Sequence, residues 1–262
     1  MSLEAENIVV RFGRREAVRS AGCAIVPGAV TVLIGPNGSG KSTLLRCLAG
    51  ALTPSSGIVR LDGEELLRLR PVVRASHIAF VPQNSPVGFD FTVGELVRLG
   101  ADTPPPPHNN GVSGRRSPRE RAAHALAVLD LTHLAARSLL ALSGGEQQRA
   151  AIARAVAQDT PYLLLDEPTA HLDLRHQSAV LGLLRRRARD DRRGVLVVLH
   201  DLNLAAAFAD TLVLLDQGRV VASGTPADVL LSSLLGPVYQ TEVHVTLHPA
   251  TGRPWVTTVS HI

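Results

Sequence analysis

The chain has 262 residues, of which 45% are hydrophobic but only 3% aromatic, and its formal net charge is +4. This composition is globular and excludes a disordered chain. The length allows one large α/β domain or two small ones, with a sizeable core filled mainly by aliphatic side chains.

No apolar run approaches the roughly 20 residues that a membrane-spanning helix needs, and the N-terminal residues enter a strand-like pattern without a charged and apolar leader. We therefore expect a cytoplasmic chain, unless a partner holds it at a membrane. The positive charge suggests nucleic acid or anionic lipid, but the densest arginine run, from Leu183, includes Asp190 and Asp191 and is typical of a solvated helix face. Cys23 and Cys47 have no spacing that indicates a metal site or a disulfide.

The predicted elements alternate along the chain between apolar strands and helices. Strands are expected over residues 3–12, 17–26, 29–35, 56–63, 77–83, 162–168, 194–200 and 211–220. Helices are expected over residues 41–50, 92–100, 119–140 and 145–158, and the Pro/Gly-rich residues 101–118 predict a loop. This alternation predicts a parallel sheet with right-handed crossovers, and a helical stretch from about residue 84 to 158 inserted between its strands.

A phosphate-binding loop is predicted between the strand 29–35 and the helix that follows. The sequence "GPNGSGKS" matches G-x-x-x-x-G-K-[ST], and its glycines let backbone N–H groups turn inward as a nest for the β- and γ-phosphates of a nucleotide. Lys41 is the only lysine of the chain; its compact charge can reach both phosphates from inside the loop, where the broad fork of arginine does not fit. Ser42 supplies a hydroxyl for Mg²⁺. The nucleotide-binding residues predicted here are Gly35, Pro36, Asn37, Gly38, Ser39, Gly40, Lys41, Ser42 and Thr43.

A second carboxylate source follows the apolar strand "YLLLDEP". Asp166 ends this strand, at the edge where open α/β sheets hold ligands, and it is predicted to hold Mg²⁺. Glu167 points to the other side of the strand and is the predicted base or orienting group for the attacking water. Alone, the pair is a polar strand end; beside a phosphate loop it indicates nucleotide hydrolysis.

Between these two sites, residues 142–149 read "LSGGEQQR". With this motif, the chain resembles over nearly its whole length the nucleotide-binding subunit of ATP-binding cassette (ABC) transporters. The resemblance implies an α/β fold of the P-loop NTPase class, with a RecA-like parallel sheet core, an N-terminal antiparallel β subdomain and an inserted helical subdomain. It places the core at residues 1–83 and 159–225, the helical subdomain at 84–158, and a short extension at 226–262, within a single domain of 262 residues.

The resemblance also assigns roles to single residues. Phe12 is implied to stack on adenine, Gln83 to contact the metal or water, and His200 to act as the switch histidine, so that Glu167, His200 and Gln83 form the catalytic set. Each of these residues alone has an ordinary structural interpretation: a core residue for Phe12, a solvated loop residue for Gln83, and a hydrogen-bonded histidine without a catalytic role for His200. Their order and placement support the family roles. The implied metal ligands are Ser42, Gln83 and Asp166.

The resemblance further implies a head-to-tail homodimer. In the family, the signature loop of one subunit covers the γ-phosphate bound by the other, and here the implied contacts are Ser143, Gly144, Gly145, Glu146 and the D-loop residue Asp173. The residues themselves agree with a second anion site, since a cluster of N–H groups is exposed at a helix start. ATP then joins the subunits, and its hydrolysis releases them.

Several segments are similar to importers of iron chelates, heme and cobalamin: residues 84–100, 166–177, 199–210, 218–230 and 238–256. We therefore expect an ATP-hydrolysing subunit on the cytoplasmic side of the membrane, docked on integral permease subunits and fed by a periplasmic or lipoprotein substrate-binding protein. A ferric siderophore or heme is the expected cargo. The alternatives are cobalamin, zinc or manganese import, or export.

A DNA-maintenance ATPase shares the same motifs. Such proteins separate their two halves by a long coiled coil, whereas the segment between Gln83 and Ser143 is too short for one and has no sustained heptads. No nucleic-acid partner is expected.

Overall fold

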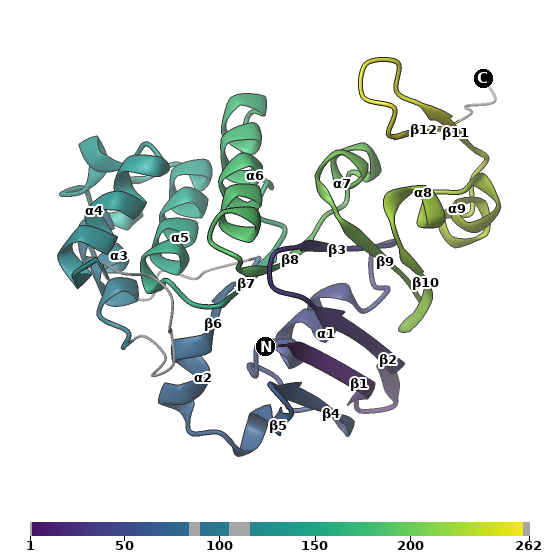
Figure 1. Cartoon of the computed structure of the whole chain (residues 1–262), viewed down its shortest axis with the longest axis horizontal. Helices are drawn as coiled ribbons and strands as arrows, with labels where there is room; N and C mark the ends of the chain where they lie inside the picture. The colour runs from purple at the N-terminus through teal and green to yellow at the C-terminus, as the bar shows by residue number, and fades with distance from the viewer. Residues whose placement is uncertain (1, 84–89, 105–115, 259–262) are drawn as a thin grey trace.

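The computed structural model describes residues 2–83, 90–104 and 116–258. Its N-terminal part is an antiparallel sheet, in which β1 pairs with β2 and β4, and β4 also pairs with β5 (Figure 1). The strand order is β2-β1-β4-β5, and the strands are β1 (Leu3–Phe12), β2 (Arg15–Ile25), β4 (Ser56–Leu61) and β5 (Glu64–Glu65).

The central sheet has the order β10-β9-β3-β8-β7-β6. Its strands are β3 (Val30–Ile34), β6 (Ile78–Val81), β7 (Tyr162–Asp166), β8 (Gly194–Val198), β9 (Thr211–Asp216) and β10 (Arg219–Gly224). All neighbouring pairs are parallel except β9 and β10, which form a hairpin. The expected strand over 211–220 is therefore two strands with a turn at Gly218.

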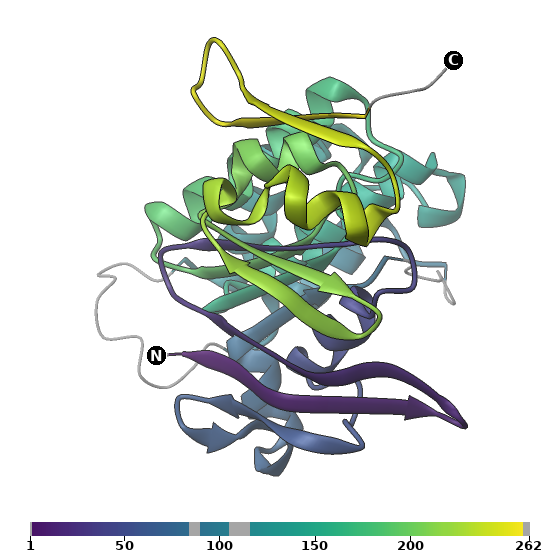
Figure 2. The same ribbon diagram turned by 90° about the vertical axis from the view of Figure 1, so that its right-hand side faces the viewer.

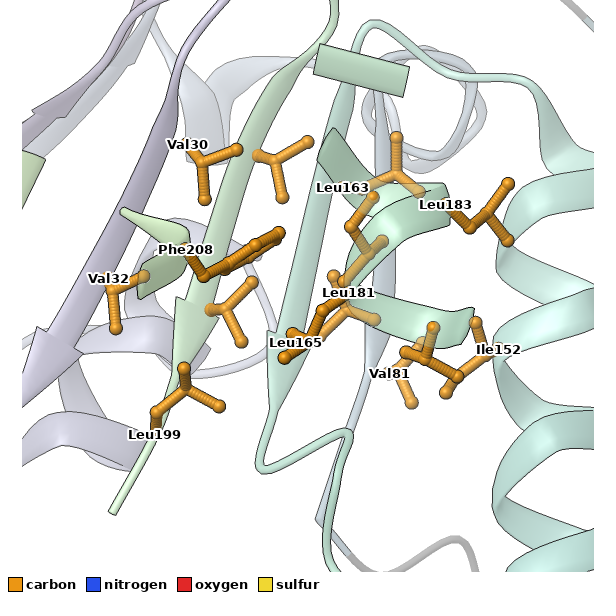
Figure 3. Close-up of a cluster of buried hydrophobic side chains, with 14 of the residues drawn as sticks. Val30, Val32, Val81, Ile152, Leu163, Leu165, Leu181, Leu183, Leu199 and Phe208 are labelled. Carbon is orange, nitrogen blue, oxygen red and sulfur yellow. The ribbon is translucent and has the colours of Figure 1, made fainter. Parts of the chain in front are cut away.

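Both faces of the central sheet are covered, so every residue of β3, β7 and β8 is buried and most are apolar. On one face, Val30 and Val32 belong to a core shared with helices α5, α6 and α7; Figure 3 shows this cluster, including Ile152, Leu181 and Phe208. On the other face, Leu33 packs in a second core against α1 and the N-terminal sheet. The helices named here are α1 (Lys41–Leu48), α5 (Gly144–Gln158), α6 (Leu174–Arg189) and α7 (Leu202–Phe208).

The described part of the inserted region, residues 90–104 and 116–158, carries three α-helices, and each begins with the same pattern. A Ser or Thr precedes the first turn and a Glu follows three residues later, so that side chains and backbone N–H groups satisfy one another in a capping box. The pairs are Thr92 with Glu95, Ser117 with Glu120, and Ser143 with Glu146. They begin α3 (Val93–Ala101), α4 (Pro118–Val128) and α5, which pack together beside the central sheet (Figure 1).

Two side chains of α5 join this helix to the strand that precedes Gln83. Arg154 Nη2 donates to the Phe80 carbonyl over 3.0 Å, and Gln158 Nε2 donates to the carbonyls of Ala75 and Ile78 over 2.6 and 3.2 Å. Burial of the Arg154 guanidinium lowers its pKa. These hydrogen bonds connect the signature helix directly to β6.

The C-terminal part follows the central sheet with two helices and a hairpin, drawn in yellow in Figure 2. These are α8 (Pro226–Val229), α9 (Ser232–Tyr239), β11 (Val243–Leu247) and β12 (Pro254–Thr258). Asn203 of α7 holds the hairpin through both of its amide atoms: Nδ2 donates to the Val256 carbonyl, and Oδ1 accepts from the Val256 N–H. None of the described helices is long and apolar enough to span a bilayer.

The α/β core with its N-terminal antiparallel sheet confirms the expected fold class. Elsewhere the elements differ from the prediction. The helix expected over 119–140 ends at Val128, because Asp130 takes a left-handed backbone with φ of 55°, and two 3-10 turns, Thr132–Leu134 and Leu139–Ala141, continue the chain. Helix α2 (Pro71–His77), the 3-10 turn Leu66–Arg68 and the elements after residue 225 were not predicted. Residues 84–89 and 105–115, which include most of the predicted loop, lie outside the described residues.

The packing of α3 on α5 leads to a prediction about Gly100. A methyl group there would lie 2.1 Å from the Arg154 carbonyl oxygen, which belongs to the backbone and cannot rotate away. We expect Gly100→Ala to reduce the free energy of unfolding by about 1–3 kcal/mol or more through overpacking. Gly182→Ala is the matched control, because its nearest neighbour is the mobile end of Arg186 at 3.5 Å and alanine favours the helix by up to about 1 kcal/mol. Urea unfolding of both variants measures this; equal stabilities would contradict the prediction.

Candidate nucleotide and hydrolysis site

The loop between β3 and α1 has the backbone that its glycines allow. Gly35, Gly38 and Gly40 all have left-handed φ values, of 142°, 77° and 102°. Side chains are also excluded by contact: a Cβ on Gly35 would lie 2.0 Å from the Leu215 carbonyl, and one on Gly40 would lie 2.5 Å from the Ala17 carbonyl. The loop is therefore enclosed by β9 and β2 and leads directly into α1, the combination of glycine-rich loop and helix N-terminus that binds anions.

Lys41 lies inside this loop and is only 4% exposed. Its Nζ donates to the carbonyls of Gly35 and Pro36, both over 2.8 Å, and contacts Ser39 Oγ at 3.4 Å. Burial lowers the Lys41 pKa, and the carboxylates of Glu167 and Asp166 oppose that shift. The narrow ring of oxygens around Nζ explains why a planar guanidinium does not replace this lysine.

Asp166 ends β7 and is fully buried. Ser42 Oγ donates to its Oδ1 over 2.8 Å, while its Oδ2 has no hydrogen-bond partner among the described residues. Burial raises the Asp166 pKa, and the hydrogen bond from Ser42 opposes this. A buried carboxylate oxygen without a partner costs free energy, and a hard divalent cation coordinated here would remove that cost. The donor set of Ser42 and Asp166 therefore fits Mg²⁺.

Glu167 lies next to Asp166 in a left-handed conformation with φ of 52°, which is uncommon for a residue with a long side chain. Gln83 Nε2 donates to Glu167 Oε2 over 3.0 Å, and His200 Nε2 lies 2.5 Å from Glu167 Oε1. The three residues that sequence reasoning grouped as catalytic thus meet at one carboxylate. They come from the ends of β7, β6 and β8, which are neighbours in the sheet.

A pocket of about 610 Å³ opens above the phosphate loop, a volume typical of small-molecule sites. Phe12 lies at its rim with 55% of its surface exposed, so it is not a core residue. Ala17 and Arg15 also line the pocket and were not predicted; the signal for Arg15 is its position opposite Phe12 across a short turn. The full lining is Phe12, Arg15, Ala17, Asn37, Gly38, Gly40, Lys41, Ser42, Thr43, Gln83, Glu167 and His200.

The other predicted nucleotide contacts are not part of this pocket. Ser143 and Glu146 bond to each other as the capping box of α5, and Asp173 caps α6 by accepting from the His176 backbone N–H over 2.8 Å. A Cβ on Gly145 would lie 3.0 Å from the His171 carbonyl, so the signature loop and the D-loop are adjacent. Ser143 and Gly144 are exposed. None of these residues lines the chain's own pocket.

Comparison with known proteins agrees with this geometry. The family model described as "ABC transporter" matches residues 18–170. The chain belongs to the ABC transporter family. It is 49% identical to a Nocardia farcinica protein named hemin import ATP-binding protein HmuV, over 98% of this chain and 88% of the relative. A Pseudomonas entomophila protein of the same name is 44% identical, over 98% of this chain and 99% of the relative. The chain is thus an ABC-type ATP-binding subunit with ATPase activity, which confirms the predicted resemblance.

Solved ABC structures share the fold. One, described as an inward-facing ABC transporter of the metal-chelate type, has a TM-score of 0.78 and 29% identity, covering 99% of this chain and 97% of that one. A dimeric ATP-binding cassette bound to ADP and phosphate has a TM-score of 0.74 and 30% identity, covering 85% of this chain and 98% of that one.

The electrostatics of Asp166 lead to a prediction about stability. Because its folded-state pKa is raised, ionisation of Asp166 destabilises the fold above that pKa, and this cost disappears at pH values below both the folded and unfolded pKa. At pH 7, we expect nucleotide-free Asp166→Asn to melt at the same temperature as the wild type or higher, while Mg²⁺-dependent stabilisation by ATP is lost. Thermal unfolding with and without Mg-ATP tests this.

Ser42→Ala provides the opposite case. It keeps the buried charge and removes its hydrogen bond, a contribution of about 1.5–3 kcal/mol for a charged acceptor. The melting temperature should fall by roughly 4 °C or more. A large fall for Asp166→Asn, instead of Ser42→Ala, would contradict this account of the carboxylate.

Proposed function

We propose that this chain is the ATP-hydrolysing subunit of a heme importer. The observation that supports this best is the match to proteins named hemin import ATP-binding protein, at 39–49% identity over 97–98% of the chain. In this proposal the ATPase does not contact the cargo. The support for heme therefore comes from sequence similarity along the whole chain. The meeting of Gln83, Glu167 and His200 beside the phosphate loop supports the hydrolytic part of the proposal.

Ser42 and Asp166, with Gln83 nearby, would hold Mg²⁺ together with the phosphates of ATP. The ion would neutralise the negative charge that develops on the phosphates. Lys41 supports the same charge from inside the loop. The unpartnered Oδ2 of the buried Asp166 supports this assignment.

Glu167 would orient and activate the attacking water. Its carboxylate is fixed by Gln83 on one oxygen and His200 on the other, so its position is set before the nucleotide binds. The left-handed backbone at Glu167 aims the side chain across the strand end, toward the pocket. In this arrangement His200 acts as a positioning group for Glu167.

Two copies of the chain would form a head-to-tail dimer around two nucleotides. The signature residues Ser143, Gly144, Gly145 and Glu146 and the D-loop residue Asp173 lie outside the chain's own pocket, which supports their use by the partner. The dimer would dock on integral permease subunits at the cytoplasmic side of the membrane, with a substrate-binding protein on the far side. Residues 84–158 would be the helical subdomain, 1–83 and 159–225 the core, and 226–262 the extension.

Glu167→Gln tests the hydrolysis role. An amide cannot accept a proton from water, so turnover should fall at least about a hundredfold, the usual contribution of a general base. ATP binding should survive and the closed dimer should accumulate, as measured by light scattering on the Mg-ATP complex. Glu64→Gln, at an exposed strand position, is the matched control. Wild-type turnover in Glu167→Gln would refute the assignment.

Reconstituted uptake tests the cargo. The chain is assembled in liposomes with its permease and substrate-binding protein, and uptake is measured for heme, ferric siderophores, cobalamin and zinc. We expect ATP-dependent heme entry that Glu167→Gln abolishes. Uptake of another cargo without heme, or outward transport, would overturn heme import and leave the ATPase assignment intact.

A further inference from the structure

The β1–β2 hairpin presents two side chains to the nucleotide pocket. Phe12 and Arg15 are the last pair of this antiparallel ladder, joined by the two-residue turn at Gly13 and Arg14. Directly opposed residues in such a pair lie on the same face of the sheet, with Cβ atoms about 4.5–5.5 Å apart. Both side chains line the same pocket. The aromatic ring and the guanidinium are thus neighbours on one rigid support.

Arg15 differs in its pairing from Arg11 and Arg19 of the same hairpin, both of which pair with Glu16. Arg11 binds Glu16 Oε1 through Nε and Nη2, each over 2.8 Å, and Arg19 Nε lies 3.8 Å from Glu16 Oε2. Glu16 is therefore occupied on both oxygens. Within residues 2–83, 90–104 and 116–258, no carboxylate pairs with Arg15, so its charge is available to a ligand.

The guanidinium of Arg15 lies against the phosphate loop. A methyl group on Gly38 would be 3.5 Å from Arg15 Nη2, and Gly38 is part of the nest of backbone N–H groups. We infer that Arg15 binds the phosphates of the nucleotide, as a second cation beside Lys41, while its neighbour Phe12 carries the base. The hairpin would then contact both ends of the same nucleotide.

Charge around the loop favours this role. Lys41 already donates hydrogen bonds to two backbone carbonyls. The negative charges of Glu167 and Asp166 also act on its ammonium group. A polyphosphate entering the pocket therefore meets the Glu167 carboxylate as well as one buried ammonium. A guanidinium that forms two parallel hydrogen bonds to phosphate offsets this repulsion. The inference rests on nucleotide binding and goes beyond heme import, so a different cargo would leave it unchanged.

Binding measurements on the full chain test the role of Arg15. ADP affinity is measured by titration calorimetry, and adenosine affinity by competition against a fluorescent ADP analogue. We expect Arg15→Ala to weaken ADP about tenfold, which corresponds to ~1.4 kcal/mol, and to leave adenosine unchanged. Arg15→Lys should recover part of the loss, because it keeps the charge without the fork. Arg14→Ala is the matched control: Arg14 is the preceding exposed arginine and does not line the pocket.

The salt dependence provides a second readout. The wild-type affinity for ADP should fall more steeply with NaCl than that of Arg15→Ala, since one screened charge contact is gone. Unchanged ADP affinity in Arg15→Ala would overturn the inference. An equal loss for ADP and adenosine would overturn it as well, because it would place the guanidinium on the base or ribose. Thermal unfolding of each variant identifies any loss that comes from misfolding.

Discussion

The parallel pairing of β6, β7, β8 and β3 is the constraint on which the site depends. Parallel strands end at the same edge of a sheet, so residues far apart in sequence meet there. Gln83 follows β6, Asp166 and Glu167 end β7, His200 follows β8, and the phosphate loop follows β3. Burial on both faces fixes the register, because a slip by one residue would exchange the two core faces of every strand. The geometry of the carboxylates is therefore set by the cores.

Several residues at this edge of the central sheet lower the stability of the isolated subunit. Asp166 is buried with one oxygen unpartnered, Lys41 is buried among carbonyls, and Glu167 has an uncommon backbone conformation. Each feature costs free energy in the isolated subunit, and a magnesium nucleotide would offset the first two. Functional sites commonly hold strain of this kind, which surrounding structure must compensate. Here the compensation comes from two aliphatic cores and from the closely packed loop glycines.

Sites formed by consecutive residues could be predicted from the sequence. Contacts that form only when distant segments pair in the fold could not. The phosphate loop and the pair Asp166 and Glu167 each lie in one short segment, so residue type and spacing identified them. The signature motif also lies in one segment and was found by its resemblance to the family. Arg15 was missed because its relation to Phe12 exists only once a two-residue turn aligns β1 and β2. The helix over 119–140 was drawn too long because buried Leu134 and Leu139 continue the apolar pattern after Asp130 has ended it. The C-terminal hairpin was missed because its contacts with α7 join residues far apart in the sequence. Asn203 binds the Val256 backbone. Arg253 donates to the carbonyls of Ala206 and Ala207.

The bonds from Arg154 and Gln158 to the backbone around β6 have a mechanical consequence. Both side chains belong to the helix that begins at the signature loop, and their acceptors precede Gln83 by only a few residues. Rotation of α5 away from β6 and the end of α2 would break three hydrogen bonds, one of them donated by the half-buried guanidinium of Arg154. The helix and the strand are therefore coupled, with the signature loop at one end of the pair and Gln83, which donates to Glu167, at the other.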